Sequence, residues 1–235
     1  AVVLTARWPG HIAPGRVVDD FVNLMDLGPT FLQAAGVTPP ACMGARGLLG
    51  VLESPAGGQV EPERTYVVTG RERHVAGARE GHLPYPQRAI RTRDFLYIRN
   101  FEPDRWPMGD PKGLDDPACV PPSYDALSRN TFTAYPDMDA SPTKAWMIHH
   151  RNDEPIRPLY RIGFGKRPAE ELYDLRKDPD HMNNVAESPA YRDTARRLAR
   201  QLFDVLRAHS DPRVTEAECR FERPPYTDPV TPPQS

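Results

Sequence analysis

The stretch Gly70–Phe101, GRERHVAGAREGHLPYPQRAIRTRDFLYIRNF, decides the fold because it places a two-strand pattern directly after a strongly polar loop. Residues 87–92 and 95–101 both have strand-like composition, and only Arg93 and Asp94 separate them. Two-residue connections of this kind join antiparallel strands. The pattern therefore predicts a β-hairpin. Both of its faces are partly apolar, so we expect another element to cover it.

The loop before the hairpin concentrates side chains that carry charge or donate hydrogen bonds: Arg71, Glu72, Arg73, His74, Arg79, Glu80 and His82. Guanidinium groups match the oxygen geometry of sulfate, phosphate and carboxylate groups. We therefore take Arg71, Arg73 and His74 as candidate substrate-binding residues for an anionic or polyhydroxylated ligand. The alternative is that Arg71 and Glu72 form a solvated ion pair and that His74 is a packed loop residue.

Composition narrows the class of protein. The 235 residues include 28 prolines and are 39% apolar, which favours short elements joined by proline-fixed connections around a substantial core. A net charge of −2 gives no general attraction to nucleic acid or to anionic lipid, so we expect neither as a partner. No apolar run reaches the roughly 18 residues of a membrane span, and the first residues do not have the pattern of a signal peptide.

The three cysteines, Cys42, Cys119 and Cys219, lie far apart and form no CxxC pair. This spacing argues against a disulfide framework or a zinc site, and leaves one long-range disulfide open. The pair His149–His150 has no third ligand at a recognisable spacing, so we do not expect a metal there. Arg105–Trp106 is a lesser candidate for stacking on a sugar face.

Changes of composition along the chain predict four parts. Residues 1–37 form a strand-and-helix piece, residues 38–63 a linker, residues 64–210 a C-terminal subdomain, and residues 211–235 a proline-rich tail that runs as an irregular arm. Within the subdomain, residues 102–158 show no sustained period. We expect them to form a long irregular loop, with room for short helices around 124–129 and 144–150.

End signals mark two helices. Asp26 is placed to cap the first, which carries its apolar side at Leu27, Thr30, Phe31 and Ala34 and ends at Gly36. The second begins at Ser188 and Pro189, and its apolar positions recur at spacings of three and four, at Tyr191, Ala195, Leu198, Leu202 and Val205. The predicted fold class is α/β. It has an α+β C-terminal subdomain in which this helix covers a small antiparallel sheet made by the hairpin and the strand ELYDL at 171–175.

Several of these stretches resemble the sulfatases of the alkaline-phosphatase-like superfamily. WPGHIAPG at 8–15 and LMDLGPTFLQAAGV at 24–37 look like the last strand-and-helix unit of the sulfatase catalytic domain. RAIRTRDFLYIRN at 88–100 and AEELYDLRKDPDHMNNVA at 169–186 look like the sheet of the smaller C-terminal sulfatase subdomain. GRERH with YPQRAIRT is similar to the branch that includes heparan N-sulfatases and bacterial relatives.

The resemblance implies hydrolysis of sulfate esters or sulfamates by a formylglycine nucleophile, which is made from Cys or Ser in a C-x-P-x-R motif, together with a calcium ion. In the family these groups lie in the N-terminal portion. The run AVVLTARW at 1–8 looks like a strand entered part-way, so we expect that portion to precede this chain. Calcium and formylglycine are accordingly expected in the N-terminal half and no cofactor in this chain.

None of the cysteines here matches the nucleophile motif, because Cys42 has Gly44 where Pro or Ala is expected, Cys119 has no arginine at the right offset, and Cys219 has no proline. The acidic pairs Asp19–Asp20 and Asp115–Asp116 are interpreted as solvated turns. We therefore expect no catalytic residue and no metal ligand within this chain.

The leading hypothesis is the C-terminal portion of a sulfatase-like hydrolase, which supplies one wall of the substrate pocket and is inactive alone. Its partners are then a sulfated carbohydrate or other sulfate ester and the N-terminal catalytic half, and the resemblance implies a periplasmic or secreted location. One alternative is a stand-alone module that binds sulfated glycans. Another is a phosphoester hydrolase of the same superfamily.

Overall fold

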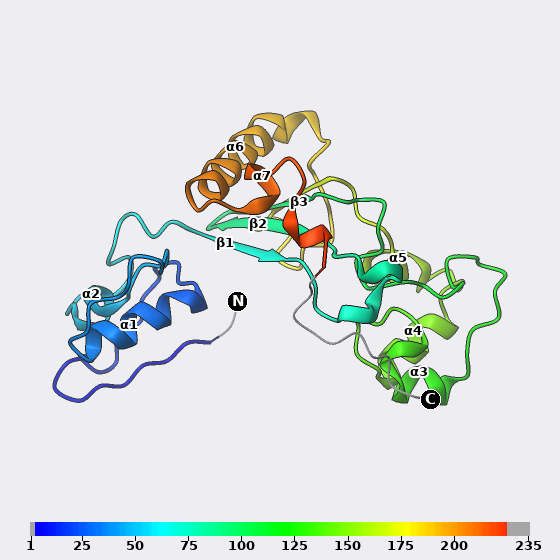
Figure 1. The fold of residues 1–235 in the computed structure, drawn as a ribbon, viewed down its shortest axis with the longest axis horizontal. Helices are drawn as coiled ribbons and strands as arrows, with labels where there is room; N and C mark the ends of the chain where they lie inside the picture. Colours follow the sequence, from blue (N-terminus) through cyan, green and yellow to red (C-terminus); the bar gives the residue numbers. More distant parts are fainter. Residues whose placement is uncertain (1–2, 225–235) are drawn as a thin grey trace. The chain divides into compact units, whose positions relative to one another are not determined.

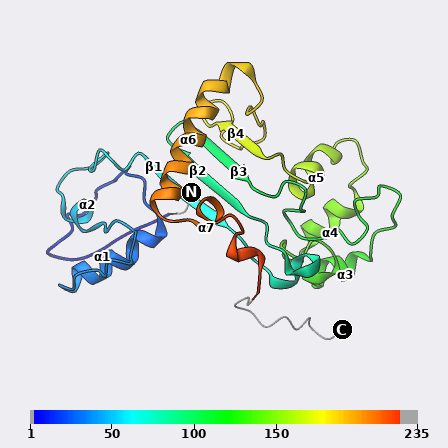
Figure 2. The same ribbon diagram turned by 45° about the horizontal axis from the view of Figure 1, so that its top comes forward.

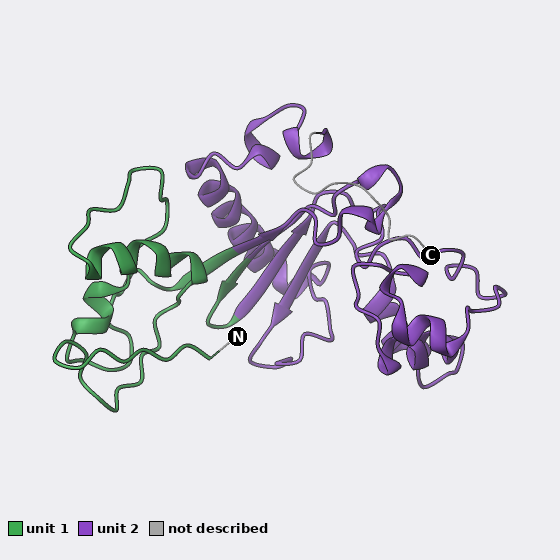
Figure 3. Cartoon of the chain, turned by 60° about the horizontal axis from the view of Figure 1, so that its bottom comes forward, with its two compact units in different colours: residues 1–68, 90–94 green, residues 69–89, 95–235 purple. Residues whose placement is uncertain are grey.

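The computed structural model describes residues 3–224 of the chain. They divide into two compact units, which Figure 3 colours separately. Unit 1 comprises residues 1–68 and 90–94, and unit 2 comprises residues 69–89 and 95–235.

A four-stranded sheet contains β1 (Tyr66–Arg71), β2 (Gln87–Thr92), β3 (Phe95–Asn100) and β4 (Glu170–Asp174), in that order across the sheet (Figure 1). β2 and β3 form the predicted hairpin, with Arg93–Asp94 as its turn. β4 pairs antiparallel with β3, in a register that aligns Phe95 with Asp174 and Arg99 with Glu170. The small antiparallel sheet expected from the sequence is thus confirmed, and its strand ends differ by one or two residues from the expected ones.

The long C-terminal helix, α6 (Arg192–Ala208), covers the β3 side of this sheet, as Figure 2 shows. It follows a short 3-10 turn, η5 (Pro189–Tyr191), and its buried side chains are Ala195, Leu198, Leu202 and Leu206. Burying each leucine stabilises the fold by about 1.5–3 kcal/mol. The expected stripe is confirmed with one shift. Leu206 is buried where Val205 was predicted. An α-helix has 3.6 residues per turn, so a spacing of four from Leu202 keeps a side chain on the buried side about as well as the predicted spacing of three.

The segment 102–158, expected to be a long irregular loop, has irregular backbone over most of its length and contains short helices. It contains α3 (Tyr124–Arg129) and α4 (Pro142–His149), and α5 (Arg157–Phe164) follows directly. The three helices enclose a core of their own: Leu114, Leu127, Ala134, Tyr135, Ala145, Ile148 and Phe164. α3 and α4 match the short helices expected around 124–129 and 144–150. Their shared core was not predicted, because such short helices do not show in the sequence which of their sides is buried.

Unit 1 contains a 3-10 turn, η1 (Leu24–Asp26), followed by α1 (Leu27–Ala34) and α2 (Leu49–Glu53). The N-terminal cap is supplied by Asn23 and not by Asp26. The Asn23 side chain accepts a hydrogen bond from the Met25 amide, whereas Asp26 already has helical backbone angles. The Asp26 carboxylate instead pairs with the buried guanidinium of Arg64 at 2.9 Å. Gly36 ends α1 as expected, with a φ of +72°.

The apolar side predicted for α1 is only partly buried. Thr30 is buried, whereas Phe31 is 68% exposed. Residues 38–63 are not a featureless linker either, since they contain α2, in which Val51 is buried, preceded by the buried Leu48. The linker was predicted from proline, glycine and small residues, and such a composition does not exclude a one-turn helix held by tertiary contacts.

The strand predicted at residues 1–6 is not present in its described part, residues 3–6, where Val3 is 92% exposed. An isolated extended segment has no partner for its backbone groups and does not persist as a strand. Residues 17–25 lead into η1, and Val18 makes a single parallel bridge to Gly58. Asp20, expected in a solvated turn, is buried, and its carboxylate accepts hydrogen bonds from the amides of Val60 and Glu61.

Residues 211–224 of the predicted proline-rich tail are not an irregular arm. They form α7 (Pro212–Thr215) and a 3-10 turn, η6 (Arg220–Glu222), and both lie in unit 2. The rest of the predicted arm, residues 225–235, lies outside the described residues. Within residues 3–224, no helix is long and apolar enough to cross a membrane.

Candidate substrate-binding loop

The polar loop between β1 and β2, residues 72–86, is called the approach loop below. It is built from two 3-10 turns, η2 (Ala76–Ala78) and η3 (Glu80–His82), and the Tyr85 amide closes it by donating to the Glu72 carbonyl at 2.7 Å. Gly81 and His82 both have positive φ values, 65° and 56°, which turn the chain sharply back toward β2. The loop is therefore held by its own backbone and is not a loose surface excursion.

A buried ion pair anchors the approach loop to the helical part of unit 2. The guanidinium of Arg79 lies 2.5 Å from the carboxylate of Asp137, and both side chains are at most 3% exposed. Arg79 also donates to the carbonyls of Trp106 and Pro107 at 2.7 and 2.8 Å. Asp137 accepts in addition from the Val75 amide at 2.9 Å. These bonds compensate the cost of burying the two charges and fix the middle of the loop.

His74 is the most accessible of the three predicted contact residues. Its side chain is 59% exposed, and its Nδ1 lies 3.9 Å from an oxygen of Asp137. An exposed imidazole beside a buried carboxylate can donate one ring hydrogen to a ligand while the other nitrogen faces the acid. His74 is thus accessible, and its distance from Asp137 is longer than a hydrogen bond.

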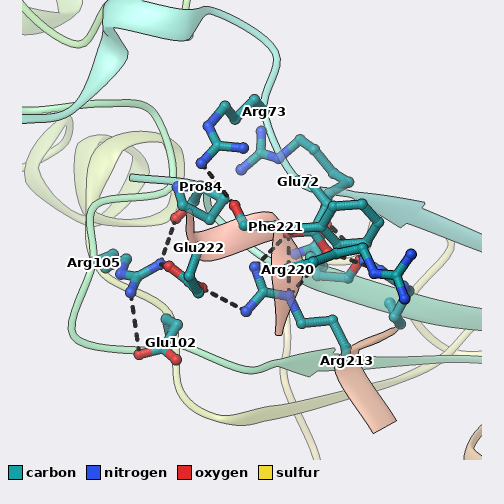
Figure 4. Close-up of polar contacts among 12 residues, drawn as sticks. Glu72, Arg73, Pro84, Glu102, Arg105, Arg213, Arg220, Phe221 and Glu222 are labelled. Carbon is teal, nitrogen blue, oxygen red and sulfur yellow. Dashed lines mark hydrogen bonds and ion pairs between the residues drawn. The ribbon is translucent and has the colours of Figure 1, made fainter. Parts of the chain in front are cut away.

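Arg73 is half-buried, and the backbone already uses part of its guanidinium. Its Nε donates to the His82 carbonyl and its Nη2 to the Phe221 carbonyl, both at 2.8 Å (Figure 4). The first bond lies within the approach loop, and the second comes from η6 near the end of the described chain. The direction of the Arg73 side chain is therefore set jointly by the loop and by the C-terminal segment.

Arg71, at the end of β1, is more enclosed. Its Nη2 donates to the Pro107 carbonyl at 2.8 Å, and its guanidinium carbon lies 5.1 Å from the centre of the Tyr85 ring. Burial lowers the pKa of Arg71 from its ordinary value and raises the pKa of Tyr85 to about 12. The Nε of Arg71 is buried and has no hydrogen-bond partner within residues 3–224. Arg71 thus contributes positive charge behind the loop and not at its surface.

Arg71, Arg73 and His74 lie within four consecutive residues at the end of β1 and the start of the approach loop. Arg79 and Asp137, which sequence reasoning did not assign, hold the middle of this loop. Arg79 was visible as one more cation in the loop. Asp137 lies in the segment without a readable period, and no local signal connects it with a residue 58 positions earlier.

The lesser candidates are engaged elsewhere. His149 contacts the Pro122 carbonyl at 3.0 Å, and His150 lies 2.6 Å from Asp153. Arg105 pairs with Glu222, and the Trp106 ring packs edge-on against the Tyr135 ring. Cys42, Cys119 and Cys219 are free thiols.

A calcium ion would need a cluster of carboxylate and amide oxygens. Within residues 3–224, no group of three or more His, Cys, Asp or Glu side chains is arranged to hold a metal ion. The residues described here therefore do not fit the calcium site that the family resemblance implies.

The chain matches known proteins over most of its length. An ulvan-active sulfatase of Formosa agariphila is 25% identical over 210 residues, which cover 89% of this chain and 34% of that protein. The human N-sulphoglucosamine sulphohydrolase is 26% identical over 221 residues, which cover 85% of this chain and 36% of that protein. The chain thus spans about a third of the length of these curated relatives.

Among solved structures, a protein in complex with its substrate D-glucosamine-2-N,6-O-disulfate matches with a TM-score of 0.54 over 90% of this chain and 29% of that one. At 20% identity this likeness shows a shared fold. The family model described as N-sulphoglucosamine sulphohydrolase, C-terminal, matches residues 1–133, which is more than half of the 235 residues. The chain therefore belongs to this family and corresponds to the C-terminal portion of a sulfatase.

Proposed function

We propose that the chain contributes one wall of the substrate pocket of a sulfatase that hydrolyses the sulfate ester or sulfamate of a sulfated carbohydrate. The observation that carries the proposal is the exposed His74 at the start of the approach loop, with Arg73 next to it in the chain and Arg71 at the end of β1. This stretch thus combines a ring donor with two guanidinium groups, and such groups are suited to a sulfated sugar.

The nature of the relatives supports the substrate class. One of the solved structures was determined with a disulfated glucosamine bound, and the curated relatives are named for ulvan and for N-sulphoglucosamine. The bond-breaking groups of the proposed enzyme, a formylglycine and a calcium ion, then belong to a portion that this chain does not span. A periplasmic or secreted location forms part of the same proposal.

The surface of unit 1 supports the presence of such a partner portion. Its described residues expose the large apolar side chains Val3, Val17, Leu24, Met25 and Phe31, each more than half exposed. Several exposed apolar side chains on one small unit are typical of an interaction surface. We propose that the catalytic portion, which makes up much of the remaining two thirds of the relatives' length, covers them.

Binding of D-glucosamine-2-N,6-O-disulfate to the 235-residue chain tests the pocket-wall role. The ligand is titrated into isotope-labelled protein, and the imidazole resonances of His74 are followed by NMR. We expect saturable shifts at His74, at least a tenfold weaker Kd in His74→Gln, and an unchanged Kd in His149→Gln, which alters another exposed histidine.

Two outcomes would overturn the proposal. One is a Kd that is the same in His74→Gln and in the unaltered chain. The other is turnover of an aryl sulfate by this chain alone after addition of calcium, because that would place the bond-breaking groups within it.

A further inference from the structure

The C-terminal segment Asp211–Glu222, called the strap below, is fastened to the approach loop by a chain of ion pairs. It begins at α6, passes through α7 and ends in η6. Asp211 caps α7 by accepting from the Arg213 amide at 2.9 Å, which turns the Arg213 side chain back toward the sheet. All residues of this network lie in unit 2.

Glu72 is the centre of the network. Its carboxylate accepts from Arg88 at 2.8 Å and from Arg213 at 2.6 Å, and it immediately precedes Arg73 in the chain. The Arg213 side chain is only 4% exposed, and its guanidinium also pairs with the carboxylate of Glu222 at 2.5 Å (Figure 4). Burial lowers the pKa of Arg213, but its hydrogen bonds to Glu72 and Glu222 outweigh burial and raise it.

Both ends of the strap have a second attachment. At the start, Asp211 receives two bonds from Arg88, at 2.6 and 3.1 Å. At the end, Glu222 accepts from Arg105 at 3.0 Å, while Arg105 also donates to the Pro84 carbonyl at 3.0 Å. The Phe221 carbonyl between these attachments accepts from Arg73, so the strap reaches the candidate site directly.

The charge balance shows what such a network can do. Three guanidinium groups, of Arg88, Arg105 and Arg213, face three carboxylates, of Glu72, Asp211 and Glu222. The positive and negative charges of these six residues cancel, so they add no net attraction for an anionic ligand. Their effect is geometric, because buried charge-assisted bonds hold each partner in one orientation.

We propose that the strap positions the ligand-contacting end of the approach loop, with Arg213 as its positioning residue. Arg213 fixes Glu72, Glu72 fixes the backbone that leads into Arg73 and His74, and the Phe221 carbonyl fixes the Arg73 guanidinium. This inference rests on the proposed function for its binding consequence, and its structural part stands on the contacts alone.

The test uses Arg213→Met in the 235-residue chain, since methionine keeps part of the stem and removes the guanidinium. The matched control is Arg207→Met, which removes an exposed arginine of α6. Arg213→Lys is a conservative second variant that restores one charged contact. Two quantities are measured: the Kd for D-glucosamine-2-N,6-O-disulfate and the hydrogen-exchange rates of individual amides.

We expect Arg213→Met to weaken the Kd at least fivefold and to speed exchange at least tenfold for the Tyr85 amide, which bonds to the Glu72 carbonyl. The Leu172 amide of β4, which bonds to the Asn184 side chain, should exchange at an unchanged rate. Arg207→Met should alter neither quantity, and Arg213→Lys should fall between. The intermediate effect of Arg213→Lys is expected because a lysine ammonium keeps the positive charge but cannot bond to both carboxylates as the forked guanidinium does.

Exchange that rises equally at Tyr85 and Leu172 would overturn the inference, because a merely structural arginine loosens the whole unit. So would an unchanged exchange rate at Tyr85, or a Kd that Arg213→Met leaves intact. If the unaltered chain does not bind the disulfate at all, the pocket-wall role fails while the exchange comparison still decides the positioning role. If Arg213→Met does not fold, the same comparison is made with Arg213→Lys.

Discussion

Lys144 makes the stability of the chain depend on pH in a direction that a surface lysine would not. It lies in α4 and is only 1% exposed. Its Nζ donates to the carbonyls of Thr131, Tyr135 and Met138 at 3.2, 3.2 and 2.7 Å. Burial lowers the pKa of Lys144 from 10.5 to about 8, and the nearby Asp139 opposes this shift. On folding, the Lys144 ammonium thus exchanges its hydrogen bonds to water for hydrogen bonds to three backbone carbonyls in the helical part of unit 2.

The sign of the pH effect follows from the proton balance. Between about pH 8 and 10.5, the unfolded chain still holds the proton of Lys144 while the folded chain has released it. Stability therefore rises with pH through this window and is lowest below pH 8, where the full cost of burying the charge is present. With these two pKa values, the free energy of unfolding should increase by about 2 kcal/mol between pH 7.5 and 9.5.

Urea unfolding at pH 7.5 and 9.5, followed by circular dichroism, measures this increase in the unaltered chain and in Lys144→Met. Burial raises the pKa of the buried tyrosines Tyr85, Tyr97, Tyr135 and Tyr173, so these hydroxyls stay protonated in the folded chain at both pH values. The cysteine thiols are common to both proteins. The difference between the two pH dependences should therefore isolate Lys144, and an identical pH dependence in the variant would refute this reasoning.

Three further perturbations test other parts of the fold. Asp137→Asn should lower the free energy of unfolding by about 3–5 kcal/mol in urea titrations, because it leaves the buried Arg79 without its counter-charge; a loss below 1 kcal/mol would contradict this account. Gly109→Ala should lower the melting temperature more than the matched Gly10→Ala. Both glycines have φ above 80°, but a Cβ at Gly109 would meet its nearest neighbour at 2.6 Å and one at Gly10 meets nothing within 4 Å; equal shifts would be evidence against crowding at Gly109. Leu202→Ala should cost about 2–5 kcal/mol in the same urea assay, since Leu202 is fully buried on the inner side of α6, and a surface-like loss under 0.5 kcal/mol would show that α6 does not cover the sheet.

The elements that were predicted correctly from the sequence are those that a pattern of neighbouring residues specifies. The β2–β3 hairpin has a two-residue turn between two strand-like runs, and α6 repeats its apolar positions over 17 residues. Both signals can be read without knowing any distant contact. Gly36 belongs to the same group, because a left-handed residue after a helix favours glycine wherever the helix packs.

The parts that sequence missed depend on partners far along the chain. Leu114 and Phe164 belong to one core although 50 residues separate them, and the helices between them are too short to show their buried face. Asp26 is a residue type that often caps helices, but its carboxylate forms an ion pair with the buried Arg64. An ion pair between residues 38 positions apart leaves no mark in either local sequence.

The same reasoning separates what sequence could and could not say about the candidate site. It grouped Arg71, Arg73 and His74 because all three lie in one short stretch. It could not say which of their donors remain for a ligand, since the acceptors of Arg71 and Arg73 are backbone carbonyls, and a carbonyl carries no residue-type signal.

This distribution of donors argues against treating the approach loop as a simple patch of positive charge. The arginines of the loop, and Arg71 just before it, donate to groups within the protein: Arg79 to Asp137, Arg71 to the Pro107 carbonyl, and Arg73 to the carbonyls of His82 and Phe221. A ligand that came to such a loop would meet the exposed imidazole of His74 first, and the guanidinium groups would act on it from behind as fixed charges. Fixed charges recognise an anion by its position as well as by its sign. On the proposed function, a loop of this kind is suited to select where a sulfate group sits on a sugar, and the proposed role of the strap is to keep its contact residues in place.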